Sequence, residues 1–146
     1  MRLVRDKDYW TCNHCPAFVF PKLEHDGVRL LGDSSDHDCP VCGTNLKPAA
    51  MEGRRLHSCS NCHGVLVGQY VFAGLIAALR SRHHGERAEL KPITQEELER
   101  TIHCPHCKRR METHPYYGPG NAVLDSCGDC GLIWCDKGEI STLGRS

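Results

Sequence analysis

Cysteines in this chain occur in pairs separated by two residues, a spacing suited to metal binding. The chain has 146 residues and 11 cysteines, and ten of the cysteines form five C-x-x-C pairs. The pairs are Cys12/Cys15, Cys39/Cys42, Cys59/Cys62, Cys104/Cys107 and Cys127/Cys130. Each C-x-x-C turn can point two thiolates in one direction, and two such turns supply the four sulfur ligands of a tetrahedral zinc site. Five pairs therefore predict two complete sites and one pair without a partner.

The surroundings of the pairs indicate which of them belong together. Two pairs contain proline, in CPVC (39–42) and CPHC (104–107), and the pairs that follow them come three residues after a leucine and precede an apolar run. The gaps between the paired motifs are 16 and 19 residues, within the C-x2-C-x15–20-C-x2-C spacing of zinc ribbons. We predict two zinc ions per chain, or three if the remaining pair also binds metal. The predicted ligands are Cys39, Cys42, Cys59, Cys62, Cys104, Cys107, Cys127 and Cys130.

Short strands and helices must position these cysteines. Residues 53–59 and 121–127 are strand-like, so each ribbon is expected to join its two knuckles by a short antiparallel sheet. Glycines 43, 64, 128 and 131 are expected to permit the close turns around sulfur. The helical spacing of one set of apolar residues predicts a helix over about 69–82: Phe72, Leu75, Ile76 and Leu79.

Capping patterns predict two further helices. The sequence TQEE offers a capping box from Thr94 to Glu97. The sequence DKGE repeats this pattern with Asp136 and Glu139 near the end of the chain, where both residues are expected to cap a terminal helix. We expect Trp134 to be a core residue beside the zinc site and Cys135 to be a half-buried small apolar residue.

The segment 104–140, CPHCKRRM…VLDSCGDCGLIWCDKGEI, resembles the transcription factor IIB-type zinc-ribbon family of small prokaryotic proteins. The motif of that family is C-P-x-C followed by C-x-x-C-x-G-x-W-x-D-x-G-E. The matching residues are Cys104, Pro105, Cys107, Cys127, Cys130, Trp134, Asp136, Gly138 and Glu139, while Leu132 stands where the family usually has glycine. The first copy is looser: Leu66 replaces the tryptophan, and Gly68, Tyr70 and Val71 replace the acidic residues and the glycine of D-x-G-E. The resemblance covers about 39–80 and 102–143 and implies zinc binding, with 113–121 as a loop between knuckles.

The expected fold is a small, metal-stabilised α+β protein with two zinc ribbons joined by helices. Residues 39–84 would form the first ribbon with its helix, 85–101 a linker with a short helix, and 102–146 the second ribbon. Residues 1–38 would form a half-ribbon-like hairpin packed on the first ribbon.

The pair without a partner, Cys12/Cys15, has the aromatic and apolar surroundings of the second half of a ribbon. It could be a metal-free hairpin whose aromatic residues pack on the first ribbon. It could instead compete with Cys59/Cys62 for Cys39/Cys42, although the gap of 23 residues lies outside the usual spacing. A third zinc site is the other alternative, with further ligands from another subunit or from His14, His25, Asp26 or His37.

Charge and motifs restrict the function classes. The chain has 18 basic and 18 acidic side chains, and zinc-bound thiolates would add about −2 at each of two sites, which weighs against nucleic-acid binding. Basic clusters at 80–87 and 108–110 leave local contact with nucleic acid open. The apolar stretch 65–79 is too short to span a membrane, and no secretory signal is evident, so we expect a cytoplasmic protein.

The sequence contains no catalytic motif, and four thiolates close the coordination shell of zinc, so we expect no enzymatic activity. No small-molecule substrate is evident. The expected function is recognition of a protein or a nucleic acid, with a relation to transcription suggested only by the family name. One alternative is a protein-interaction adaptor or homo-oligomer that docks through the 69–82 helix. Another is a rubredoxin-like electron carrier with iron in the four-cysteine sites.

Overall fold

The computed structural model describes residues 2–4, 9–11, 14, 18–19, 27–116 and 118–146. The first strands along the chain are β1 (Arg2–Val4), β2 (Tyr9–Thr11), β3 (Phe18–Val19), β4 (Arg29–Leu30), β5 (Lys47–Met51), β6 (Arg54–Ser58) and β7 (Val65–Gly68). The remaining elements are α1 (Gln69–Arg82), α2 (Gln95–Glu99), β8 (Glu112–Pro115), β9 (Val123–Cys127), β10 (Leu132–Cys135) and α3 (Glu139–Gly144).

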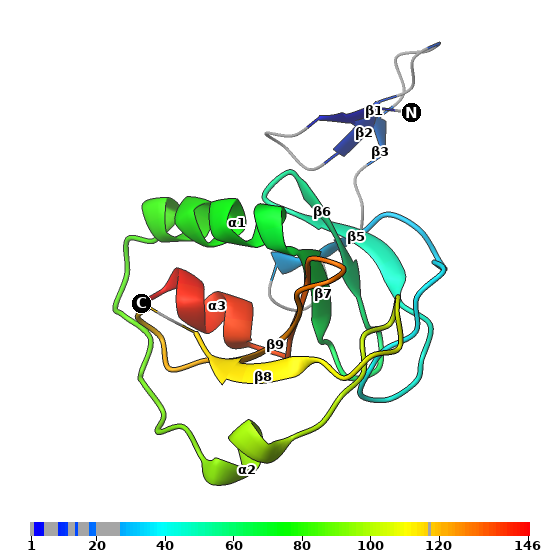
Figure 1. The fold of residues 1–146 in the computed structure, drawn as a ribbon. Coiled ribbons are helices and arrows are strands. Elements are labelled where there is room, and N and C mark those ends of the chain that lie inside the picture. Colours follow the sequence, from blue (N-terminus) through cyan, green and yellow to red (C-terminus); the bar gives the residue numbers. More distant parts are fainter. Residues whose placement is uncertain (1, 5–8, 12–13, 15–17, 20–26, 117) are drawn as a thin grey trace.

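Strands from both halves of the chain form one antiparallel sheet (Figure 1). The strand order is β4-β5-β6-β7-β10-β9-β8, so the two halves meet where β7 pairs with β10. The sequence predicted two ribbons with sheets of their own, and the single seven-stranded sheet differs from that expectation. Each of β7 and β10 would be an edge strand in an isolated three-stranded ribbon, with unpaired backbone groups along an apolar run. Their mutual pairing removes both edges.

The pairing of β7 with β10 relates the two halves by a local two-fold axis. Leu66 follows Cys62 by four residues, Trp134 follows Cys130 by four, and these two equivalent residues are direct partners in the ladder. The flanking pairs agree, because Ile133 pairs with Val67. The axis therefore passes between Leu66 and Trp134. The helices that follow the two strands, α1 and α3, pack against each other.

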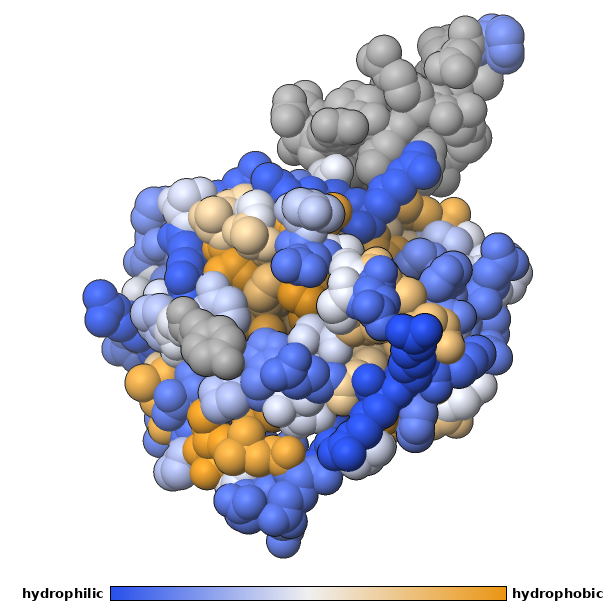
Figure 2. Space-filling view, in the orientation of Figure 1, coloured by the Kyte–Doolittle hydropathy of each residue, from blue (hydrophilic) through white to orange (hydrophobic). Residues whose placement is uncertain are grey.

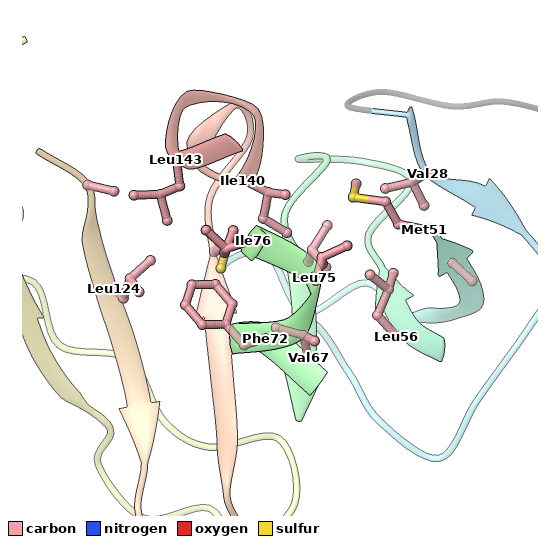
Figure 3. Close-up of a cluster of buried hydrophobic side chains, with 14 residues drawn as sticks. Val28, Met51, Leu56, Val67, Phe72, Leu75, Ile76, Leu124, Ile140 and Leu143 are labelled. Carbon is pink, nitrogen blue, oxygen red and sulfur yellow. The ribbon is translucent and has the colours of Figure 1, made fainter. Parts of the chain in front are cut away.

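Alternation along the two central strands gives the sheet two different apolar faces. Val65 and Val67 belong to the core beneath α1 and α3, whereas Leu66 belongs to a second cluster that contains the cysteine pairs. In Figure 3, the α1 residues Leu75 and Ile76 lie near Ile140 of α3. The helix predicted over 69–82 is thus confirmed. Phe72, Leu75 and Ile76 of its apolar face are buried inside the chain, and Leu79 is partly buried against the same core. That face is not free to dock a partner or a second copy.

The other local predictions have mixed outcomes. Strands β6 and β9 occupy the two segments predicted as strand-like, 53–59 and 121–127. The segment 113–121, predicted as a loop, begins inside strand β8. The capping box of α2 is confirmed, since the Thr94 hydroxyl accepts the Glu97 N–H and the Glu97 carboxylate accepts the Thr94 N–H.

A separate three-stranded sheet, β1-β2-β3, lies near the N-terminus. Strands β2 and β3 pair antiparallel on either side of residues 12–17, as a hairpin around the unpartnered cysteine pair requires. Cys12, Cys15, His25 and Asp26 lie outside the described residues, so the metal-free hairpin and the third zinc site both stay predictions. The packing of 1–38 on the first ribbon and the other domain limits also stay predictions. Among the described residues, no helix is both long and apolar enough to cross a membrane.

Candidate metal centres

Two groups of four cysteines converge in the fold, and together they contain all eight predicted ligands. Cluster 1 consists of Cys39, Cys42, Cys59 and Cys62, and cluster 2 consists of Cys104, Cys107, Cys127 and Cys130. Within each cluster the sulfur atoms all lie within 4.8 Å of one another. Among the described residues, these are the only groups of three or more potential ligands that are close enough to share a metal ion.

The distances between sulfur atoms fit zinc. In cluster 1, Sγ of Cys42 lies 3.4 Å from Sγ of Cys59, and Sγ of Cys39 lies 3.6 Å from Sγ of Cys62. In cluster 2, Cys107 and Cys127 are separated by 3.6 Å. A tetrahedral zinc ion with Zn–S bonds of about 2.3 Å holds its sulfur ligands about 3.8 Å apart. A small outward movement of the thiolates would therefore complete each site, and the two clusters support two zinc ions per chain.

Each C-x-x-C turn of clusters 1 and 2 continues into a residue with left-handed backbone conformation. The residues that follow the second cysteine of each pair have φ between 62° and 75°: Gly43, His63, Lys108 and Gly131. In the first turn, the Gly43 N–H donates to the Cys39 carbonyl at 3.0 Å. Of the four glycines expected to permit these turns, only Gly43 and Gly131 have this conformation. Gly64 and Gly128 do not have a positive φ, so a left-handed conformation is not the reason for glycine at those positions.

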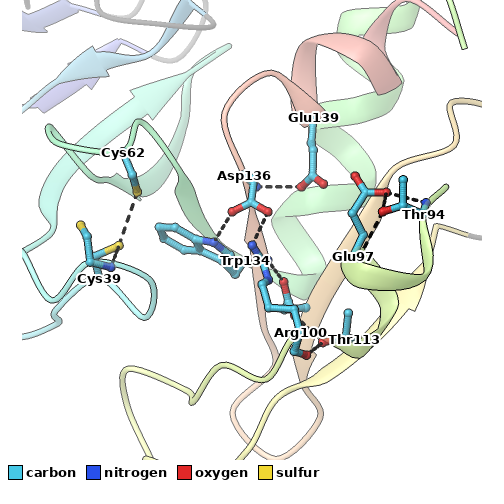
Figure 4. A network of polar contacts seen from close by, with 11 residues as sticks. Cys39, Cys62, Thr94, Glu97, Arg100, Thr113, Trp134, Asp136 and Glu139 are labelled. Atoms are coloured by element: carbon cyan, nitrogen blue, oxygen red, sulfur yellow. Dashed lines mark hydrogen bonds and ion pairs between the residues drawn. The ribbon is translucent and has the colours of Figure 1, made fainter. Parts of the chain in front are cut away.

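Gly64 is required for a different reason, which is close packing against Trp134. A Cβ atom on Gly64 would lie 2.1 Å from Cζ2 of Trp134, too close for any side chain. The Trp134 side chain is completely buried in an apolar cluster that contains cysteines of both metal sites, which confirms it as a core residue. Figure 4 shows its ring on the side of Cys39 and Cys62. One indole ring from the second half therefore packs against a knuckle of the first.

A partly buried polar network holds the other edge of this ring (Figure 4). The indole Nε1–H of Trp134 donates to Asp136 at 3.1 Å, and Arg100 donates to the same carboxylate at 2.6 Å. Arg100 also forms an ion pair with Asp125, whose side chain is fully buried and accepts the Thr113 hydroxyl. Sequence reasoning missed Arg100 and Asp125. No local pattern could have identified them, because 25 residues separate the two partners.

The same network corrects the predicted capping role of Asp136. Helix α3 begins at Glu139 after Gly138, whose φ is 86°, and no side chain caps it. Only half of the capping box forms, because the Glu139 carboxylate accepts the Asp136 N–H at 2.7 Å while the Asp136 carboxylate binds Trp134 and Arg100. Burial, and then the nearby Asp136 charge, raises the pKa of Glu139 to about 8.

Cys135 belongs to neither cluster. It was predicted to be half-buried, and it is completely buried in the core beneath α1 and α3. Burial raises the pKa of its thiol well above the ordinary value. A neutral thiol in this position acts as a small apolar side chain, as expected.

The two clusters differ in the groups that surround them. At cluster 1, hydrogen bonds from the Thr44 hydroxyl and then from Asn61 lower the pKa of Cys42 to about 5. At cluster 2, the Arg109 backbone N–H lowers the pKa of Cys107 to about 7. The Arg109 guanidinium also forms an ion pair of 2.7 Å with Asp129 of the second knuckle.

Several basic side chains that sequence reasoning considered for nucleic-acid contact bind within the chain. Nε of Arg80 donates to the Leu143 carbonyl at 2.9 Å, near the end of α3. Arg82 forms an ion pair with Glu52, and Nζ of Lys108 donates to the Pro105 carbonyl at 3.0 Å.

Comparison with known proteins supports the zinc-ribbon interpretation of the first half of the chain. Residues 38–70 match the family model described as transcription factor zinc-finger, the transcription factor IIB-type zinc ribbon. The matched segment contains cluster 1 and strands β5, β6 and β7. No curated protein and no solved structure matches the chain. The family match confirms the zinc-ribbon resemblance, on the half of the chain whose motif is the looser of the two.

Proposed function

We propose that this protein is a non-enzymatic recognition module, built from two zinc ribbons whose zinc sites are structural. The observation that carries the proposal is the pair of all-cysteine clusters that share one buried apolar cluster around Trp134. Four thiolates occupy every position of a tetrahedral zinc ion, so neither site would retain a water molecule to activate. Zinc in such a site contributes to folding instead of catalysis.

Metal analysis combined with circular dichroism tests this role. We expect two zinc ions per chain and loss of the β and α signals when a strong chelator removes them. Cys107→Ser should reduce the zinc content to one, whereas Cys135→Ala, which changes a cysteine outside both clusters, should retain two. Unchanged spectra after complete zinc removal would refute a structural role. A content of three zinc ions per chain would indicate that Cys12/Cys15 binds metal. A red protein that contains iron would favour the electron-carrier alternative.

We further propose that the partner is a protein. Three of the basic side chains that could contact phosphates have partners within the chain: Arg80, Arg82 and Arg109. With zinc bound, each cluster would also carry about −2 of charge, which opposes a polyanion. In the view of Figure 2, hydrophilic side chains cover most of the surface and apolar residues appear in separate patches.

Binding of fluorescent single- and double-stranded nucleic acids at low salt tests this choice. We expect no binding by the zinc-loaded protein. Binding that weakens steeply with added salt would contradict the proposal and would assign the basic residues to phosphate contacts. Capture of proteins from the native host in the presence of nuclease tests for the proposed protein partner and for any role in transcription.

A further inference from the structure

The two metal clusters are unequally protected from solvent. Cys42 is exposed, whereas the other seven cysteines of the clusters are buried or half-buried. Its neighbour Val41 is also exposed, with 47% of its surface accessible, so the tip of this knuckle is open on both sides of the turn. The corresponding cysteine of cluster 2, Cys107, is half-buried.

The groups beside the exposed sulfur differ as well. At cluster 2, Arg109 lies two residues after Cys107, and its ion pair with Asp129 joins the two knuckles. The corresponding positions at cluster 1 are Thr44 and Asn61, which are neutral. This ion pair holds the two knuckles of cluster 2 together beside the half-buried Cys107. The neutral residues of cluster 1 cannot form such an ion pair, and Cys42 is the exposed sulfur of that cluster.

We propose that Cys42 is an oxidant-reactive ligand, so that hydroperoxides oxidise cluster 1 before cluster 2 and release its zinc. The inference rests on the zinc-binding part of the proposed function. It adds a covalent modification site to a cluster that the proposed function treats as purely structural.

The chemistry requires a hydroperoxide as the oxidant and a second thiolate within reach. The Cys42 thiolate attacks hydrogen peroxide, an S–O bond forms, the O–O bond breaks and hydroxide leaves, so that sulfur is oxidised to sulfenic acid and the peroxide is reduced. The Cys59 thiolate, 3.4 Å away in the folded chain, then attacks this sulfur. An S–S bond forms, the S–O bond breaks and a second hydroxide leaves. Overall, two thiolates and one peroxide give one disulfide and two hydroxide ions, and only two cysteines remain to hold the metal.

Zinc release from the full chain, loaded with two zinc ions, provides the test. Hydrogen peroxide is added in excess with a chromogenic zinc indicator, and the disulfides are located by mass spectrometry of peptides. We expect one zinc ion in a first phase, at least about tenfold faster than the second, because oxidation follows thiolate exposure. The first disulfide should join Cys42 to Cys59. Release of both ions in one phase, or a first disulfide between Cys107 and Cys127, would overturn the proposal.

Exchange of the neighbouring groups gives matched variants that retain all eight cysteines. The double variant Thr44→Arg/Asn61→Asp places the ion pair at cluster 1 and should slow the first phase. The reciprocal variant Arg109→Thr/Asp129→Asn should speed the second phase. If neither rate changes, the proposed protection by the ion pair is wrong. The zinc content before oxidation tests the proposed function separately, because a chain that binds fewer than two zinc ions contradicts that function whatever the order of release.

Discussion

Substitution of Gly64 by alanine tests the contact that joins the two halves of the protein. The added Cβ would lie 2.1 Å from Cζ2 and 2.7 Å from Cη2 of Trp134. Carbon atoms pack at about 3.5 Å or more, so the ring would have to move by about 1.4 Å. The ring has little room to move, because the Trp134 side chain is completely buried and its Nε1–H donates to Asp136.

The expected loss of stability follows from these contacts. Overpacking of a filled core costs about 1–3 kcal/mol, and loss of the indole hydrogen bond would add about 1 kcal/mol. We therefore expect Gly64→Ala to lower the free energy of unfolding by about 2–4 kcal/mol, a large share of the 5–15 kcal/mol typical of a small protein. Urea unfolding with zinc in constant excess measures the change, because zinc binding itself contributes to the apparent stability.

Two further variants make this test specific. Gly128→Ala is the matched control, because a Cβ there would meet no atom within 4 Å, and it should change stability by no more than about 0.5 kcal/mol. Trp134→Leu removes the large ring, so Gly64→Ala should cost much less in that background than in the wild-type chain. Equal stability of Gly64→Ala and wild type, or the same cost in both backgrounds, would refute the packing argument.

Other substitutions test the Arg100–Asp125 ion pair, the Glu139 carboxyl and the knuckles. Arg100→Met leaves the fully buried Asp125 without its cation and should lower the free energy of urea unfolding by about 3–5 kcal/mol; a second change, Asp125→Asn, should restore part of the loss. The Glu139 pKa of about 8 lies above the ordinary value of about 4.3, so the folded state favours the protonated carboxyl. The stability that this protonated carboxyl contributes is fully present below about pH 4.3 and is lost as pH rises through 8. Glu139→Gln should therefore reduce the fall in thermal stability between about pH 6 and 9, and an unchanged pH profile would contradict this. Gly43→Ala places a residue with a side chain at a backbone φ of 75° and should lower the free energy of urea unfolding of the zinc-loaded protein by about 1 kcal/mol. An unchanged free energy would show that the turn tolerates alanine.

Local patterns in the sequence predicted the features that depend on nearby residues. The two four-cysteine sets follow from spacing, because each C-x-x-C turn is formed by consecutive residues. The helix over 69–82 follows from apolar residues that recur with helical spacing, and the limits of α1 agree with it. The capping box at Thr94 was predictable because both of its hydrogen bonds lie within four residues.

Features that depend on distant residues could not be predicted. The pairing of β7 with β10 joins residues that are more than 60 positions apart, and the sequence alone does not choose that partner from other apolar strands. The capping prediction at Asp136 was wrong because Arg100, 36 residues earlier, takes the carboxylate that the local pattern assigned to the helix end. Gly64 was interpreted as a turn residue, since its contact with Trp134 appears only in the fold.

The single sheet also accounts for two of the departures from the zinc-ribbon motif, at Leu66 and Leu132. Leu66 occupies the tryptophan position of the first half, and its direct partner across the local two-fold axis is Trp134. Two indole rings at this axis would compete for the same buried space, so leucine on one side makes room for tryptophan on the other. The glycine that Trp134 needs is Gly64 of the first half. Leu132 occupies the equivalent position in the second half. It lies on the side of the smaller Leu66 and packs in the same cluster. Each half thus provides one part of the tryptophan–glycine contact. Because neither half contains both parts, we expect the stability of each metal site to depend on the presence of the other half.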